Sequence, residues 1–219
     1  MAISTDSITT RIADALGFLT DYGFRYFKSY QDFRRKDASG FSYITINVTT
    51  SNRASYSLAF YVGTRVDPLE TTIRQLRGDT NKLDHYSRSV SNYTVNVGPN
   101  SSNWDHPVWG NWSLLSDGDV DSAIPEASTF IRDTMLPFAN ANTTAENVRR
   151  TLLDAPDKTI NLMPHHQILA ADVLNGDLER LDTDYAFLDE RYAKWIERLR
   201  LDLEQFYTLS RAAMTESSA

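Results

Sequence analysis

The feature that most constrains the fold is a pair of runs, 41–50 and 55–62, in which apolar side chains take every second position. In the first run these positions hold Ile44, Ile46 and Val48. A period of two is typical of a β-strand that buries one face. The four residues between the runs include serine and asparagine, which favour turns. The pattern therefore predicts an antiparallel β-hairpin.

Aromatic residues concentrate around this hairpin. The stretch from Tyr22 to Tyr61 holds eleven of the 25 aromatic residues in the chain. Aromatic side chains bury more apolar surface than most others, so the sheet is predicted to carry the main core. An aromatic face that binds a ligand is the alternative use of the same side chains.

The order of the remaining patterns indicates the fold class. A helix is expected over 4–22, ended by Gly23, and strand-like runs then continue to about residue 115, whereas the rest of the chain has only helical spacing. This segregation predicts an α+β fold, in which an antiparallel sheet of about five to seven strands packs on helices and an all-helical C-terminal part follows. We expect a sheet region over 1–118 and a helical region over 119–219 that packs on it, together forming one continuous domain.

Three details of this prediction can be compared with a structure. In the sheet, a turn at Ser91-Asn92 is expected to join two strands. Residues 121–138 have an apolar stripe, and Pro137 is expected to end that helix. Further along the chain, apolar residues spaced three and four positions apart predict one long terminal helix over 183–214. Because so small a domain cannot easily cover its length of about 45 Å, this helix is also a candidate homodimer interface.

The composition excludes several functional classes. The chain has 219 residues and a net charge of −7, and an acidic protein repels the phosphate backbone of nucleic acids. No apolar run approaches the roughly 18 residues of a membrane helix, and the N-terminus does not resemble a signal peptide. The absence of cysteine suits a reducing compartment. We therefore expect a cytoplasmic protein that binds neither nucleic acid nor membrane and carries no cofactor.

Two groups of residues are candidates for a binding site. Arg34 and Lys36 share one face of a predicted strand and could clamp a phosphate or carboxylate; a charged edge strand that prevents aggregation is the alternative. Trp104, His106 and Trp112 lie close together in the sequence, and tryptophan is enriched at recognition hot spots. Tryptophan also packs well in cores, so the same stretch could be buried.

The sequence does not predict a metal site. His165 and His166 are the only adjacent histidines, and neighbouring side chains on a helix point about 100° apart, which makes a poor chelate. The loop from Asp117 resembles the start of a calcium-binding loop, but Ser122 and Ser128 stand where that loop needs glycine and glutamate. We expect the two histidines to be polar residues at a helix start.

Short stretches in the first 155 residues or so share a common layout. They are Leu16-Gly17-Phe18 or Tyr22-Gly23-Phe24, Phe33-Arg34-Arg35, the strand over 41–48, and Met135-Leu136-Pro137. This layout resembles an uncharacterised bacterial domain family that is sometimes found near toxin and immunity genes. The resemblance implies an amphipathic N-terminal helix, a strand hairpin and a bacterial origin, and the function of that family is itself unsettled.

Three functions are compatible with these observations. The first is a non-enzymatic, immunity-like module that presents an acidic or aromatic surface to a protein partner. The second is an enzyme or small-ligand-binding protein with a pocket between sheet and helices, using Arg34, Lys36 or His85. The third is a homodimeric structural module built on residues 183–214. Because no motif specifies a reaction, we favour the first.

Overall fold

The predicted hairpin forms the centre of the sheet. In the computed structural model, β3 (Gly40–Asn52) pairs antiparallel with β4 (Ser55–Val66), and Ile46 lies opposite Phe60. Both side chains are buried on the same face, so the register follows the alternation in the sequence. The structure describes residues 4–52, 55–80, 89–93, 112–154, 164–193 and 197–216.

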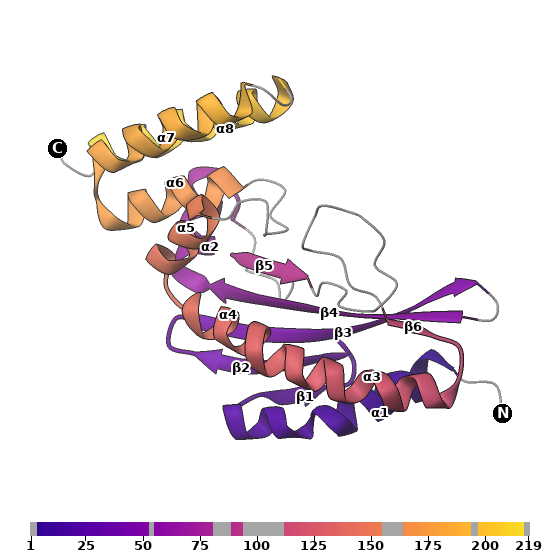
Figure 1. Cartoon of the computed structure of the whole chain (residues 1–219). Helices are drawn as coiled ribbons and strands as arrows, with labels where there is room; N and C mark the ends of the chain where they lie inside the picture. The colour runs from indigo at the N-terminus through magenta and orange to yellow at the C-terminus, as the bar shows by residue number, and fades with distance from the viewer. Residues whose placement is uncertain are drawn as a thin grey trace.

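Four further strands complete an antiparallel sheet of six (Figure 1). The order is β1-β2-β3-β4-β5, and β6 pairs with β4 beside β5. The bounds are β1 Arg25–Phe27, β2 Asp32–Asp37, β5 Val90–Tyr93 and β6 Trp112–Leu114. The α+β class and the antiparallel sheet are confirmed. The turn expected at Ser91-Asn92 is wrong, because both residues lie within β5 and pair with β4.

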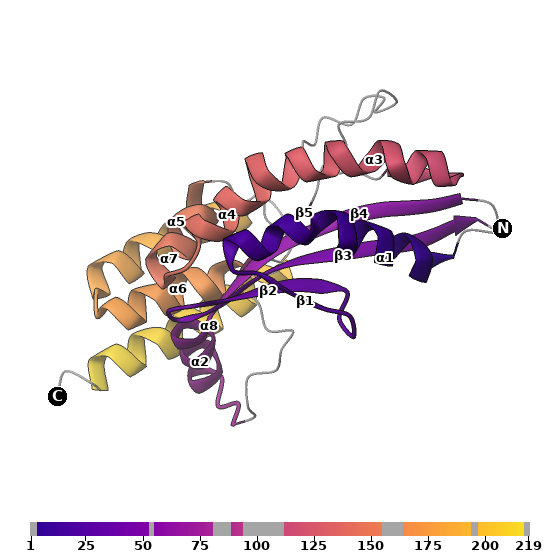
Figure 2. The same ribbon diagram turned by 90° about the horizontal axis from the view of Figure 1, so that it is seen from below.

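Two long helices cover one face of the sheet (Figure 2). α1 (Thr5–Ala15) begins at Ser4, whose hydroxyl accepts a hydrogen bond from a backbone N–H in the first turn. It continues into the 3-10 helix η1 (Leu16–Tyr22), which ends at Gly23 with φ 82°, as predicted. α3 (Asp117–Phe130) packs beside α1. These helices and the sheet enclose the first hydrophobic core, which contains Ile8, Ile12, Phe33, Ile44, Phe60 and Ala127.

The helix after α3 does not end at Pro137. A π-helical turn, η2 (Ile131–Met135), follows α3, and α4 (Leu136–Ala141) continues beyond the proline. Pro137 lies in the first turn of α4, where a missing backbone N–H costs little. The wider π-turn changes the hydrogen-bonding pattern ahead of the proline, so the chain stays helical where the sequence predicted a stop.

The remaining helices form a second layer next to one end of the sheet (Figure 1). They are α2 (Asp67–Leu76), α5 (Ala145–Asp154), α6 (Pro164–Asn175), α7 (Leu178–Tyr192) and α8 (Glu197–Glu216). This layer has its own hydrophobic core, which includes Leu69, Leu169, Leu181 and Phe206. Thus α3 and α4 pack on the sheet, whereas α5 to α8 pack with α2. The division at residue 118 stays a prediction.

A long terminal helix is present, but it begins later than predicted. α7 ends at Tyr192, and α8 starts at Glu197 and has 20 residues. The two helices pack against each other, with the rings of Tyr185 and Tyr207 stacked 3.9 Å apart. The apolar stripe over 183–214 therefore serves two neighbouring helices that cover each other. In the part of the chain that the structure describes, no helix is both long and apolar enough to cross a membrane.

Candidate functional site

Arg34 of the predicted ligand clamp has a partner within its own strand. Its Nε donates to both carboxylate oxygens of Asp32 at 3.0 Å, and Nη2 donates to Oδ2 at 2.8 Å. The guanidinium also lies 4.4 Å from the ring centroid of Tyr30. Lys36, two residues further along β2, is exposed. Arg34 is therefore already paired with a carboxylate of its own strand. A clamp for phosphate or carboxylate made of Arg34 and Lys36 stays a prediction.

Trp112 lies at the start of β6, partly buried. Its ring packs edge-on against Phe60 with centroids 5.8 Å apart, and its indole N–H donates to Oε2 of Glu126 at 3.0 Å. It borders a hollow of about 470 Å³ along α3. Trp112 therefore contributes to the core and also faces solvent. The other predicted site residues lie outside the described part of the chain: His85, Trp104 and His106.

A buried polar cluster connects α6 with α8. The Nε2 atoms of His165 and His166 lie 2.8 Å and 2.6 Å from the same oxygen, Oδ2 of Asp202. The two imidazole rings are in contact, with centroids 4.2 Å apart. One potential ligand atom from each of the three residues lies within 4.8 Å of the others. We call these three residues the His-His-Asp cluster.

The expectation that the two adjacent histidines make a poor chelate on their own stays a prediction, and the structure adds a third group that the sequence did not indicate. His165 and His166 follow Pro164 in the first turn of α6, and their Cα–Cβ bonds differ in direction by about 100°. Asp202, however, belongs to α8, which packs against α6. Its carboxylate lies between the tips of the two rings. Asp202 on α8 thus contacts both histidines, although their side chains leave α6 in different directions.

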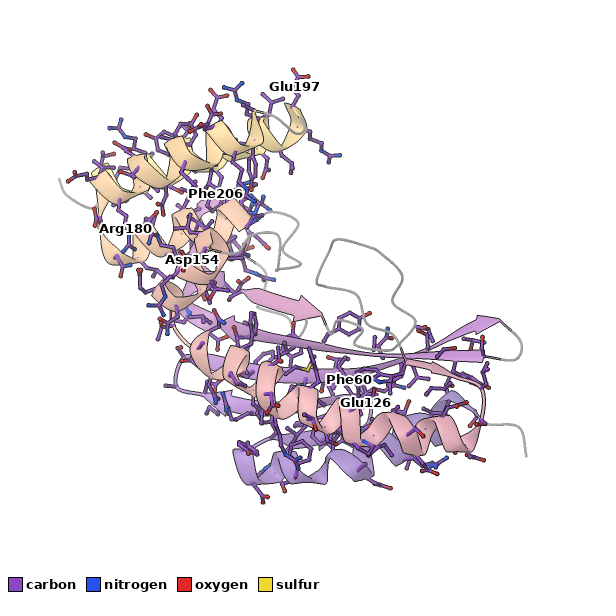
Figure 3. All side chains as sticks on the ribbon, in the orientation of Figure 1. Phe60, Glu126, Asp154, Arg180, Glu197 and Phe206 are labelled. Atoms are coloured by element: carbon purple, nitrogen blue, oxygen red, sulfur yellow. The ribbon has the colours of Figure 1, made fainter. Side chains whose placement is uncertain are left out.

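The environment of the cluster differs between its two sides. On the inner side, Nδ1 of His165 lies 3.3 Å from the hydroxyl of Tyr192. The ring of His166 packs against Phe206 at a centroid distance of 4.5 Å, and Figure 3 shows Phe206 between α8 and the helices beneath it. On the outer side, Arg77 at the end of α2 places Nη2 2.7 Å from Nε2 of His166. The cluster on α6 and α8 therefore also contacts α7 and the end of α2.

Burial favours the neutral form of both imidazoles. Desolvation, together with the neighbouring His165 and Arg77, lowers the pKa of His166 to about 3. Desolvation also lowers the pKa of His165. For Asp202, burial would raise the pKa, but interactions with the two histidines, including a hydrogen bond from each, outweigh it, and the pKa lies below its ordinary value. The cluster thus presents two neutral imidazoles and one carboxylate, which are the ionisation states that bind metal ions.

The cluster opens to solvent through a small hollow of about 210 Å³. Its lining residues come from α2 and α8 and are Arg77, Asp202, Gln205, Phe206 and Leu209. Arg77 has 43% of its side chain exposed and Asp202 has 28%, whereas His165 is fully buried. A small ligand could therefore reach the carboxylate and the guanidinium from solvent, with the histidines behind them.

A second buried polar group lies further along α6. Asp172 and Asp184 share Arg149, whose Nε lies 3.0 Å and 2.6 Å from their carboxylates. Arg180 of α7, labelled in Figure 3, donates from Nε to Asp172 at 2.6 Å. Desolvation and the nearby Asp184 raise the pKa of Asp172 to about 7. Two arginines balance these two carboxylates, so we interpret this group as a structural link among α5, α6 and α7.

One signal in the sequence could have indicated the cluster. α6 is apolar on most of its sides, with Ile168, Leu169, Ala170 and Ala171 all buried, and a helix of that kind is buried in the protein. Histidines at its start are then buried as well, and buried imidazoles need polar partners. The identity of that partner, Asp202, could not be read from the sequence.

Comparison of the chain with family models, with curated proteins and with solved structures finds no match. The resemblance to a bacterial domain family near toxin and immunity genes therefore stays a prediction. The site must be interpreted from its own geometry.

Proposed function

We propose that the protein binds a divalent first-row transition metal ion, such as Zn²⁺, through His165, His166 and Asp202. The observation that carries this proposal is the convergence of two imidazole nitrogens and one carboxylate within 4.8 Å. Two histidines and one carboxylate are a known ligand set for zinc and for non-haem iron. Hydrogen bonding among these residues alone accounts for the arrangement less well.

A hydrogen-bonded network alone leaves one contact of His166 unfavourable. A neutral imidazole Nε2 is either a donor or an acceptor. If Nε2 of His166 donates to Asp202 at 2.6 Å, it cannot accept from Arg77 at 2.7 Å. If it accepts from Arg77, its lone pair faces the carboxylate. A metal ion in place of the guanidinium would accept electron pairs from both histidines and from Asp202, and no contact would then be unfavourable.

The change that a metal requires is small for the two separations between histidine and Asp202. Zinc–nitrogen bonds of about 2.0–2.1 Å in a tetrahedral site place ligand atoms roughly 3.3 Å apart. The histidine nitrogens now lie 2.8 Å and 2.6 Å from the Asp202 oxygen, so these separations must widen by roughly 0.5–0.7 Å. Asp202 is partly exposed and Arg77 more so, which allows both side chains to move without disturbing the core.

The surroundings also supply an outer shell for such a metal. If His165 binds through Nε2, its Nδ1–H can donate to the Tyr192 hydroxyl 3.3 Å away, and hydrogen bonds of this kind orient metal-binding histidines. Phe206 provides an apolar wall beside His166. Three protein ligands leave at least one coordination position for water or another ligand. Within the protein, the metal would fasten α6 to α8.

Calorimetric titration of the purified, chelator-treated protein with Zn²⁺ tests the proposal. We expect one ion per chain. Asp202→Asn, which keeps the side-chain shape but removes the charge, should weaken binding by about 100-fold or more. Asp189→Asn is the matched control, because Asp189 lies on α7 in an ion pair with Arg200. Equal affinity in the two variants, with both folded by circular dichroism, would refute the proposed site.

The earlier hypotheses of a protein partner and of a homodimer through 183–214 do not depend on the metal site. Both stay predictions, as does a pocket between sheet and helices. The hollow that opens on the His-His-Asp cluster lies between α2 and α8, so the ligand-binding function proposed here belongs to the helical layer.

A further inference from the structure

Arg77 occupies the mouth of the His-His-Asp cluster. Its Nη2 lies 2.7 Å from Nε2 of His166 and 3.5 Å from Oδ1 of Asp202. Its guanidinium carbon is also 5.9 Å from the ring centroid of Phe206. A bound metal ion would repel this guanidinium from the cluster. Because 43% of the side chain is exposed, Arg77 can move outward into the adjoining hollow.

Metal binding would change the charge of the site. Without metal, the negative charge of Asp202 and the positive charge of Arg77 balance. A divalent ion would leave two net positive charges in a partly buried place. Such charge is costly unless it is paired. The metal's open coordination position and the guanidinium would then both face the same hollow.

We infer that the metal-loaded protein binds a small oxyanion of the phosphate or carboxylate type between the metal ion and Arg77. One oxygen of the anion would occupy the open metal position, and the others would accept hydrogen bonds from the guanidinium, whose forked donors match both anions. Gln205, which also lines the hollow, offers an amide N–H₂ as a further donor. This inference rests on the proposed metal site.

The dimensions of the hollow limit the class of ligand. Its volume of about 210 Å³ is below the range of about 300–1,000 Å³ that is usual for drug-sized ligands. Phe206 and Leu209 close part of its wall with apolar surface. Inorganic phosphate, a terminal phosphate group or a short carboxylic acid fits these limits, whereas a nucleotide base or a sugar ring would have to remain outside.

Cobalt(II)-loaded protein allows the two binding events to be measured separately. The visible absorption of cobalt reports metal uptake first, in buffer without phosphate or carboxylate, and then reports a change of coordination when phosphate or acetate is added. We expect a saturable spectral change with the wild-type protein. Arg77→Ala should bind cobalt at least as tightly but lose anion affinity by at least about tenfold. Arg74→Ala, which removes a positive charge from the same helix, is the control and should keep anion affinity.

Each result has a distinct meaning. Equal anion affinity in Arg77→Ala and wild type, or equal anion binding with and without metal, would overturn the inference and leave the metal site intact. Metal uptake with no spectral response to either anion would do the same. Failure of the wild-type protein to take up metal would refute both proposals. A response to phosphate but not to acetate would support the inference and narrow the ligand to phosphate groups.

Discussion

The two layers of the molecule bury different kinds of side chain. Among the described residues of the sheet with α1 and α3, the buried acidic, basic or histidine side chain is Asp32, which is paired with Arg34. The layer of α2 and α5 to α8 buries five such groups, which are Glu70, His165, His166, Asp172 and Asp184. Apolar residues could fill these positions with similar or better stability. The difference makes the helical layer the better candidate for a binding site, and it is there that the proposed metal site lies.

The largest expected effect comes from removing a partly buried cation that pairs with buried carboxylates in the helical layer. Arg149→Ala leaves the carboxylates of Asp172 and Asp184 without their shared partner, and we expect the free energy of unfolding to fall by about 3–5 kcal/mol. Arg11→Ala in the sheet layer is the matched control, because Arg11 pairs with exposed Asp117 and Asp121 and should cost less than about 1 kcal/mol. Urea unfolding measures both. Losses of equal size would contradict the contrast between the layers.

A smaller effect is expected from the ionisation of Asp172. Burial and Asp184 raise its pKa from 3.8 to about 7 in the folded protein, although Arg180 and Arg149 oppose the shift. The protonated carboxyl is therefore favoured by folding. Its contribution to stability is fully present below about pH 4 and is lost as the pH rises through 7.

Unfolding of the wild type and of Asp172→Asn at several pH values between 4 and 8 measures this contribution. The amide does not ionise, so the stability of the variant should fall less steeply over that range. Subtracting the two curves removes the effects of groups that are common to both proteins. Parallel curves would show that the two arginines keep Asp172 ionised in the folded state throughout.

The smallest expected effect concerns Arg34 in the sheet layer. Arg34→Lys keeps the charge but loses the paired hydrogen bonds to Asp32 and the flat contact with Tyr30, which should lower the free energy of unfolding by about 1 kcal/mol. Thermal or urea unfolding measures the change. An unchanged stability would mean that the ion pair does not hold Arg34, and the predicted clamp with Lys36 would gain support.

The strands of the sheet could be predicted because their alternating pattern is set by residues that are close together in the sequence. The alternation of Ile44, Ile46 and Val48 determines which face is buried, and a shift by one residue would expose all of them. The end of the N-terminal helical segment, α1 followed by η1, was likewise marked by Gly23, whose φ of 82° is unfavourable for most other residues. Such signals act within a few residues and need no knowledge of the rest of the chain.

The candidate site could not be predicted because its parts come from distant positions. Asp202 is 36 residues from His166, and Arg77 is 89 residues from it. The helical period indicates which face of each helix is buried, but it does not indicate which two faces meet. The end of α7 at Tyr192 was also missed, because one continuous stripe suits two packed helices as well as a single long one.

The most direct test of the metal site is X-ray diffraction from crystals of the zinc-loaded protein, with data collected above and below the zinc absorption edge. We predict one anomalous peak per chain, about 2.0–2.2 Å from Nε2 of His165, Nε2 of His166 and a carboxylate oxygen of Asp202. The guanidinium of Arg77 should have moved away from His166. A zinc-loaded crystal that has no peak at these three residues, and keeps Arg77 against His166, would contradict the proposal.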